Sequence, residues 1–164
     1  MGVSADEYRD AMRMFCSGVT IVSAASDERL FGMTATSFAS LSLDPPLVVV
    51  CLEKESHTLA AVAAARSFAV NVLAFDQEEA ARAFARAGVK PFDRIGYSTA
   101  RNGAALIQGA LAWIECDVTE IIPMGDHDVV IGEVERCETT EGSPLIYFDR
   151  DYRAIVDLEG RSST

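Results

Sequence analysis

The chain has 164 residues, of which 49% are hydrophobic, and it carries a formal net charge of −11. This length and apolar content predict one packed domain and argue against an intrinsically disordered chain. Because contacts with nucleic-acid backbones or anionic lipid need clustered Lys and Arg, the acidic balance argues against a nucleic-acid-binding protein and against a membrane-surface protein.

The cysteines indicate a reducing environment and no metal chemistry. All four are widely separated and none forms a C-x-x-C pair, so we expect free thiols, no metal site and no redox dithiol. The N-terminal segment lacks the apolar core of a signal peptide, and the longest apolar run, "LVVVCL", is too short to cross a bilayer. The sequence therefore predicts a soluble cytoplasmic protein.

The first third of the chain predicts one helix followed by three strands. Ser4 and Glu7 have the spacing of a capping box at the start of an amphipathic helix, whose apolar face carries Tyr8 and Met12 and which should end at Gly18. Three strands are then expected, the first two forming a hairpin around the polar turn "DERL": 19–26, 30–40 and 46–52.

The rest of the chain alternates strands with two more helices. Ser56 is expected to cap a helix over 57–66, and "QEEAARAFARAG" predicts a helix over 77–88 with Ala and Phe on its inner stripe. Glycines and a proline predict a loop over 89–109, and loops of that length are often functional. Further strands are expected at 67–73, 110–121, 127–138, 144–148 and 152–158.

The strand at 110–121 alternates in polarity, which predicts two faces. The inward residues are Ala112, Ile114, Cys116 and Val118, and the outward residues are Trp113, Glu115, Asp117 and Thr119. Most links between strands are too short for parallel crossovers. We therefore expect a mainly β fold, an antiparallel barrel with helices in two of its longer connections. It should be a single domain over 1–164, with a core at about 10–156 and a flexible tail at 157–164.

Three segments could carry chemistry, and each also has a plain structural explanation. "GMTATSFASLSLDPP" places five hydroxyl residues in a strand that enters a turn, so this face is either solvated or lies against a polar ligand. In "CLEKESHT", Lys54 and Ser56 stand where a strand ends and a helix begins, which suits a phosphate or an ordinary N-cap beside a solvated lysine. His127 in "GDHDVVIGEV" could polarise a substrate, contact a cofactor or lie in a surface turn.

No Rossmann or P-loop signature is present. Taken in order, however, "SGVTIVSA", "GMTATSFASLSLDPPLVVVCLEKESHT", "FAVNVL", "ALAWIECDV", "GDHDVVIGEV" and "PLIYF" resemble the flavin reductase family, the short reductase components of two-component flavin-dependent monooxygenases. The resemblance spans about 15–152, and "GMTATSF", "SLDPP" and "GDH" are its most specific parts. It implies a Greek-key split β-barrel of the FMN-binding type with a few short flanking helices, usually as a homodimer with flavin sites near the subunit interface.

The same resemblance implies an enzyme, an NAD(P)H:flavin oxidoreductase. It would transfer hydride from NADH, or from NADPH, to FAD or FMN, and free reduced flavin would then leave for a separate monooxygenase. The alternative is a non-catalytic flavin-binding protein of the same split-barrel fold, which would hold flavin without turnover. The sequence does not choose between FAD and FMN.

The resemblance also implies site residues. His127 would lie by the flavin ring and the nicotinamide as a positioning group, with no obligatory proton transfer. The flavin-binding residues would be Met33, Thr34, Ala35, Thr36 and Ser37 at the ring, Ser40 at the ribityl side, Cys51, Leu52, Lys54, Ser56, His57 and Thr58 at the ribityl and phosphate groups, and Phe84 and Tyr152 as flanking aromatics. Where many members carry Asn, this chain has Thr36, so the edge of the ring site lacks an amide.

Overall fold

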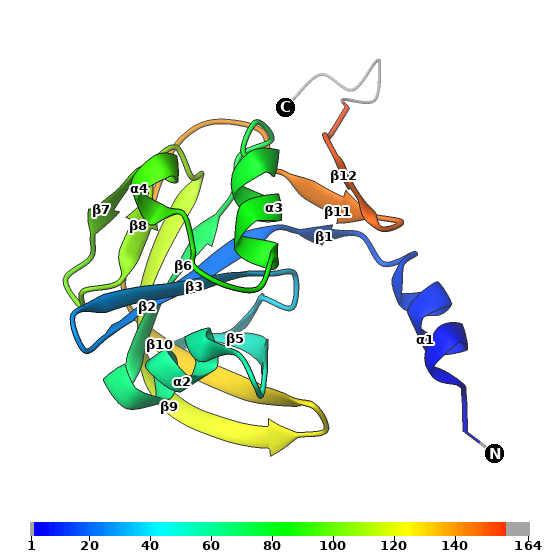
Figure 1. Ribbon diagram of the computed structural model, residues 1–164, viewed down its shortest axis with the longest axis horizontal. Coiled ribbons are helices and arrows are strands. Elements are labelled where there is room, and N and C mark those ends of the chain that lie inside the picture. Colours follow the sequence, from blue (N-terminus) through cyan, green and yellow to red (C-terminus); the bar gives the residue numbers. More distant parts are fainter. Residues whose placement is uncertain (1, 157–164) are drawn as a thin grey trace.

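The computed structural model describes residues 2–156, so the tail predicted at 157–164 lies outside the described residues. Figure 1 shows a body of strands with short helices on its surface, and an N-terminal arm that stands away from it. Within the described part the helices are α1 (Ala5–Met12), α2 (His57–Ala65), α3 (Glu78–Ala85) and α4 (Phe92–Ile95).

A seven-stranded antiparallel sheet forms most of the body, in the order β3-β2-β6-β9-β10-β5-β4. Its strands are β2 (Thr20–Ser26), β3 (Arg29–Ala35), β4 (Ala39–Leu43), β5 (Pro46–Glu53), β6 (Ser67–Val72), β9 (Ala112–Met124) and β10 (His127–Thr139). The prediction of a mainly β, antiparallel fold is confirmed.

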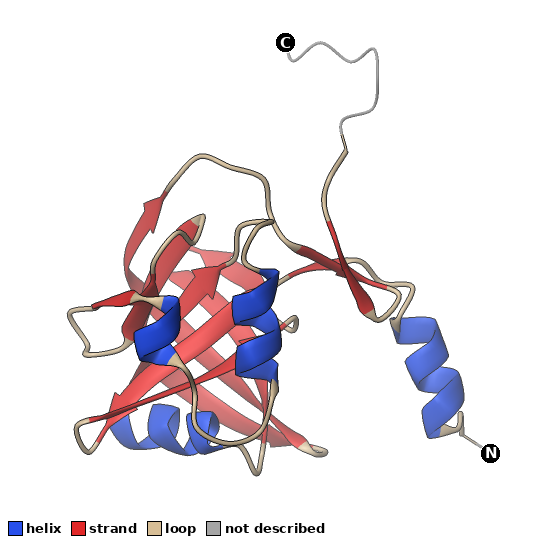
Figure 2. Ribbon diagram, turned by 45° about the horizontal axis from the view of Figure 1, so that its top comes forward, coloured by secondary structure: helices blue, strands red, loops and turns tan. Residues whose placement is uncertain are grey.

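The two edges of this sheet are joined by very little chain. β3 and β4 are the outermost strands, yet only residues 36–38 connect them, and four residue steps span at most about 14 Å. The sheet must therefore curl until the end of β3 lies close to the start of β4, which gives the barrel shape visible in Figure 2. The prediction of a single strand over 30–40 was therefore wrong. The chain leaves β3 at Ala35, turns a corner at 36–38 and enters β4 at the other edge of the sheet.

Two smaller sheets lie beside the barrel. One has the order β1-β11-β12, with bounds β1 (Ser17–Gly18), β11 (Ile146–Phe148) and β12 (Asp151–Arg153). The other pairs β7 (Tyr97–Thr99) with β8 (Ala105–Ile107). The segment at 89–109, predicted as loop, thus contains α4 and a short hairpin. The last strand, predicted at 152–158, is shorter, and residues 157 and 158 fall outside the described chain.

The side chains of β2 face two cores in alternation. Val22 and Ala24 point into the barrel, where they join Phe68 and Val130 and other fully buried side chains of the central strands. Ile21 points the other way and packs in a second core under α3. Burying one such side chain contributes about 1.5–3 kcal/mol. Both faces of β2 are therefore covered, one by the barrel interior and the other by the core under α3.

One predicted outward residue of β9 is buried. The Glu115 side chain accepts a hydrogen bond from the Arg101 N–H at 2.9 Å, and Glu115 is only 6% exposed. The segment around Asn102 lies over this face, since Asn102 donates to the Phe68 carbonyl at 3.0 Å. The predicted alternation of the strand is present, but the segment at 101–102 covers part of its polar face.

The capping box predicted for α1 is confirmed, since Ser4 and Glu7 each accept a hydrogen bond from the other's backbone N–H. The helix ends at Met12, earlier than predicted, and Gly18, the predicted end, belongs to β1. None of its residues is buried. Among the helices of residues 2–156, none is long and apolar enough to cross a membrane.

Candidate functional site

A cleft of about 800 Å³ opens between β3, the start of α2, the end of α3 and the segment from residue 86 to residue 97. Its size is in the range of small-molecule sites. Six predicted site residues line it: Met33, Thr34, Ser56, His57, Thr58 and Phe84. The other predicted residues lie outside this lining: Ala35, Thr36, Ser37, Ser40, Cys51, Leu52, Lys54, His127 and Tyr152. The structure thus brings the β3, α2 and α3 parts of the predicted site together.

Two aromatic rings form the floor of the cleft beneath Gly32. The rings of Phe84 and Phe92 meet edge to face with their centroids 4.9 Å apart, and Phe84 is fully buried. A Cβ atom on Gly32 would lie 2.9 Å from a ring carbon of Phe84, so the close approach of β3 to the rings needs glycine. Two residues on, the Thr34 hydroxyl donates to the Ala81 carbonyl at 2.6 Å. The floor is therefore apolar and tied to α3.

The N-terminus of α2 supplies hydrogen-bond donors to the cleft. Ser56 caps the helix, since its hydroxyl accepts from the Leu59 N–H at 3.1 Å. The N–H groups of His57 and Thr58 belong to the first turn, where an α-helix offers no backbone acceptor. Together with the positive end of the helix dipole, these donors suit an anionic group such as a phosphate.

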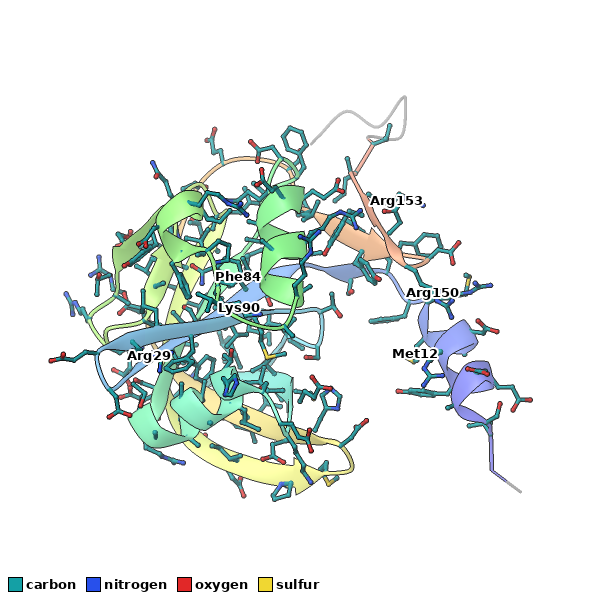
Figure 3. The ribbon with its side chains drawn as sticks, viewed as in Figure 1. Met12, Arg29, Phe84, Lys90, Arg150 and Arg153 are labelled. Carbon is teal, nitrogen blue, oxygen red and sulfur yellow. The ribbon has the colours of Figure 1, made fainter. Side chains whose placement is uncertain are left out.

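Three cationic side chains that the sequence reasoning missed line the same cleft: Arg29, Arg86 and Lys90. Lys90 donates to the Phe84 carbonyl at 2.9 Å and also to the Arg86 carbonyl, so it closes the C-terminal end of α3. Burial lowers the pKa of the Lys90 ammonium. Figure 3 shows Lys90 beside Phe84, with Arg29 farther along β3. Of the three, only Lys90 lies in the long segment at 89–109, whose length is itself a signal because loops of that length are often functional.

The corner at 36–38 is fixed to β5 by one side chain. The Ser37 hydroxyl donates to the Cys51 carbonyl at 2.7 Å and accepts from the Cys51 N–H at 3.2 Å. Thr36 is exposed in the same corner, whereas Leu52 is fully buried inside the barrel. Thr36 and Ser37 therefore offer surface to a ligand, and Leu52 supports β5 from within.

His127 begins β10, directly after the turn that follows β9. It pairs with Glu53 at the end of β5, a residue that lines the cleft. The distance from His127 Nδ1 to a carboxylate oxygen of Asp126 is 2.8 Å, and this hydrogen bond holds the pKa of Asp126 below its ordinary value. With Nδ1–H directed at the carboxylate, Nε2 is left for a ligand. Within residues 2–156, no group of three or more His, Cys, Asp or Glu side chains is arranged to hold a metal ion.

Tyr152 lies on β12, outside the cleft lining. Its ring packs edge to face against Tyr147 with the centroids 5.4 Å apart, and the Arg82 guanidinium lies 4.7 Å from its centroid. Burial is the main cause of the raised pKa of the Tyr152 hydroxyl. Arg82 belongs to α3, so the helix that covers the cleft floor also contacts the C-terminal strand.

A family model described as the flavin reductase like domain matches residues 12–156. The chain belongs to this family. The match to the flavin reductase like domain includes the cleft, the 36–38 corner and the turn that carries His127.

Curated relatives and solved structures agree with this assignment. The reductase component of 4-hydroxyphenylacetate 3-monooxygenase from Thermus thermophilus is 39% identical over 152 residues, which cover 92% of this chain and 97% of the relative. FMN reductase (NADH) SmoA from Agrobacterium fabrum is 38% identical and covers 89% of this chain and 83% of the relative. The solved structure of the NADH:FAD oxidoreductase SgcE6 from Streptomyces globisporus, in complex with NAD and FAD fragments, has a TM-score of 0.90 at 32% identity, covering 98% and 99% of the two chains. The chain shares its fold with SgcE6.

Proposed function

We propose that this chain is an NAD(P)H:flavin oxidoreductase that transfers hydride from NADH to FAD or FMN and supplies free reduced flavin to a separate flavin-dependent monooxygenase. The observation that carries the proposal is the match to the flavin reductase like domain over 12–156, which includes every side chain of the cleft. Relatives named as an FMN reductase (NADH) and as a monooxygenase reductase component support both halves of the reaction.

The residues of the cleft fit a flavin nucleotide. Its floor is apolar, as a planar ring requires, and its lining includes the α2 N-terminus, whose donors suit a phosphate. Three cations and four carboxylates (Glu28, Glu53, Glu55 and Asp93) complete the lining. When bound, the flavin supplies the hydride-accepting ring of the reaction. His57 and Thr58 would hold the phosphate through their N–H groups, with Ser56 keeping that helix end in place.

The ring would lie along the strand and corner at 33–37, with Ser40 and Cys51 toward the ribityl chain. Backbone and hydroxyl groups there can stabilise the negative charge that hydride transfer places on the ring. His127 would position the nicotinamide through its free Nε2 at the neighbouring edge of β5. Phe84 acts from beneath β3 as a floor residue, and Tyr152 would close the nicotinamide side from β12.

We also propose that the chain acts as a homodimer in the cytoplasm. The support for a dimer is the N-terminal arm, where four large apolar side chains are exposed in the isolated chain: Tyr8, Met12, Met14 and Phe15. Such a patch is typical of a protein interface. The support for the compartment is chemical, since the proposed reaction consumes NADH and the four cysteines are unpaired.

The test is NADH oxidation by the purified protein, measured with and without added FAD or FMN. We expect oxidation to depend on added flavin and to accelerate when a consumer of reduced flavin is present. Dialysis before the assay distinguishes a reductase from the alternative, a non-catalytic flavin-binding protein, because the latter would keep its flavin and show no turnover. Absence of flavin-stimulated oxidation with both NADH and NADPH would refute the proposal.

A further inference from the structure

Lys54 is hydrogen-bonded to the turn before His127. Its ammonium donates to the Gly125 carbonyl at 2.8 Å, and its own N–H donates to the Asp126 carbonyl at 3.1 Å. It is not among the residues that line the cleft, although its neighbours Glu53 and Glu55 are. The side chain therefore points at the β9–β10 turn and not at the N-terminus of α2.

Asp128 completes this arrangement. Its carboxylate lies 3.8 Å from the Lys54 ammonium, and its Oδ1 atom is buried without a hydrogen-bond partner among the described residues. A buried carboxylate oxygen that lacks a hydrogen bond is costly unless a positive charge stands near it. Lys54 supplies that charge, so the pair links the end of β5 to the start of β10 on both sides of His127.

The contacts of Lys54 surround His127 in the sequence. They fall on Gly125, Asp126 and Asp128, while His127 itself pairs across the sheet with Glu53. The ring of His127 makes one polar contact in the described chain, with the adjacent Asp126, so its position depends on the backbone of this turn. A group that fixes the turn therefore fixes the imidazole.

We infer that Lys54, paired with Asp128, is a positioning residue that holds His127 in place for the nicotinamide and does not bind the flavin phosphate directly. The inference rests on the proposed function. Under this inference, Lys54 serves the nicotinamide end of the site through His127. The flavin phosphate is bound at the other end, by the α2 N-terminus and the cations of the cleft. Lys54 would then affect the use of NADH more than the affinity for flavin.

The experiment measures flavin affinity and NADH kinetics separately for Lys54→Met, Lys54→Arg and Asp128→Asn. Flavin Kd is obtained by fluorescence titration without nicotinamide, and KM for NADH at saturating flavin. We expect Lys54→Met to raise the KM for NADH about tenfold, which corresponds to ~1.4 kcal/mol, with flavin Kd changed less than about twofold. Asp128→Asn should also raise the KM for NADH. Lys54→Arg, which keeps the charge, should raise it much less than Lys54→Met does.

A double-mutant cycle shows whether Lys54 acts through His127. In a His127→Ala background, Lys54→Met should cause no further rise in the KM for NADH. Arg136→Met, which removes a cation from the distal half of β10, is the matched charge control and should leave both constants unchanged. Weakened flavin binding with an unchanged KM for NADH, or additive effects in the cycle, would overturn the inference. A wild-type protein without flavin-stimulated oxidation would instead refute the proposed function itself.

Discussion

At the scale of single residues, the two lysines of the chain do similar work, Lys90 within the cleft lining and Lys54 outside it. Lys54 holds the β9–β10 turn through the Gly125 carbonyl, and Lys90 holds the end of α3 through the Phe84 carbonyl. Each ammonium satisfies backbone oxygens that would otherwise lack partners. Both side chains therefore hold a backbone segment in place next to the site.

Gly32 is the residue at which the cleft floor has the least room. In Gly32→Ala the new Cβ would meet ring carbons of Phe84 at 2.9 Å and of Phe92 at 3.0 Å. Because both rings are buried, we expect a loss of about 1–3 kcal/mol in the free energy of unfolding. Urea denaturation measures this change in the free energy of unfolding. Gly18→Ala is the control, since nothing lies within 4 Å of its added Cβ. Equal stability of the two variants would contradict this packing.

The cysteines differ sharply in accessibility. Burial raises the pKa of the Cys116 thiol to about 12, so below that pH the thiol is protonated as well as covered. Cys137, on the neighbouring strand, is exposed. We expect iodoacetamide at pH 8 to alkylate Cys137 and to leave Cys116 unmodified until denaturant is added, as peptide mass spectrometry would show. Alkylation of both at similar rates under native conditions would mean that the β9–β10 pair opens readily.

At the scale of secondary-structure elements, α2 connects the stability of the fold to the site. Ser56→Ala removes the hydroxyl that accepts from the Leu59 N–H, and such a loss costs about 1 kcal/mol. Because the freed end of α2 lines the cleft, flavin affinity should fall as well. The two readouts are urea denaturation and flavin titration, with Ser98→Ala, an exposed serine on β7, as control. A destabilised variant with unchanged flavin affinity would remove the α2 N-terminus from the site.

The elements that the sequence predicted well are those with strong local signals. The capping box of α1, the Ser56 cap and the alternation of β9 all follow from neighbouring residues, and the structure has each of them. The break of the 30–40 strand could not be predicted in this way. It arises because the sheet curls, and that depends on the pairing of all seven strands. The burial of Glu115 likewise depends on a distant segment.

The candidate site also combines residues that a local motif predicts with residues that only the tertiary fold brings together. Among the residues predicted from the family motifs, those that line one cleft are Met33 and Thr34 of β3 and Ser56, His57 and Thr58 at the start of α2, whereas Thr36, Ser37 and His127 lie outside its lining. Arg29 joins that cleft from the β2–β3 hairpin, Arg86 from the end of α3, and Lys90 from the segment that follows it. These cations lie close together because α3 packs on the barrel. The spacing of residues in the sequence does not predict this packing.

At the scale of the whole molecule, the N-terminal arm is the part that the barrel does not stabilise. α1 contributes no buried residue, and Figure 3 shows Met12 and Arg150 together at this arm, apart from the cleft. Its polar contacts run to the nearby β11–β12 turn through Asp10–Arg150 and Arg13–Asp149. The apolar face of α1 is not covered by the barrel core. In the proposed dimer, the second subunit would cover this face.

Met12→Glu tests that dimer. The Met12 side chain lies on the apolar face of α1 and is 46% exposed in the isolated chain, so a carboxylate there is harmless to a monomer but must be desolvated in an interface. We expect the wild type to sediment as a dimer and Met12→Glu to shift toward monomer at the same concentration, with flavin-dependent activity falling in parallel if each site needs both subunits. Arg9→Gln changes the net charge equally, removes only the exposed pair with Asp6, and should remain dimeric. A wild type that sediments as a monomer at all concentrations would contradict the proposed assembly.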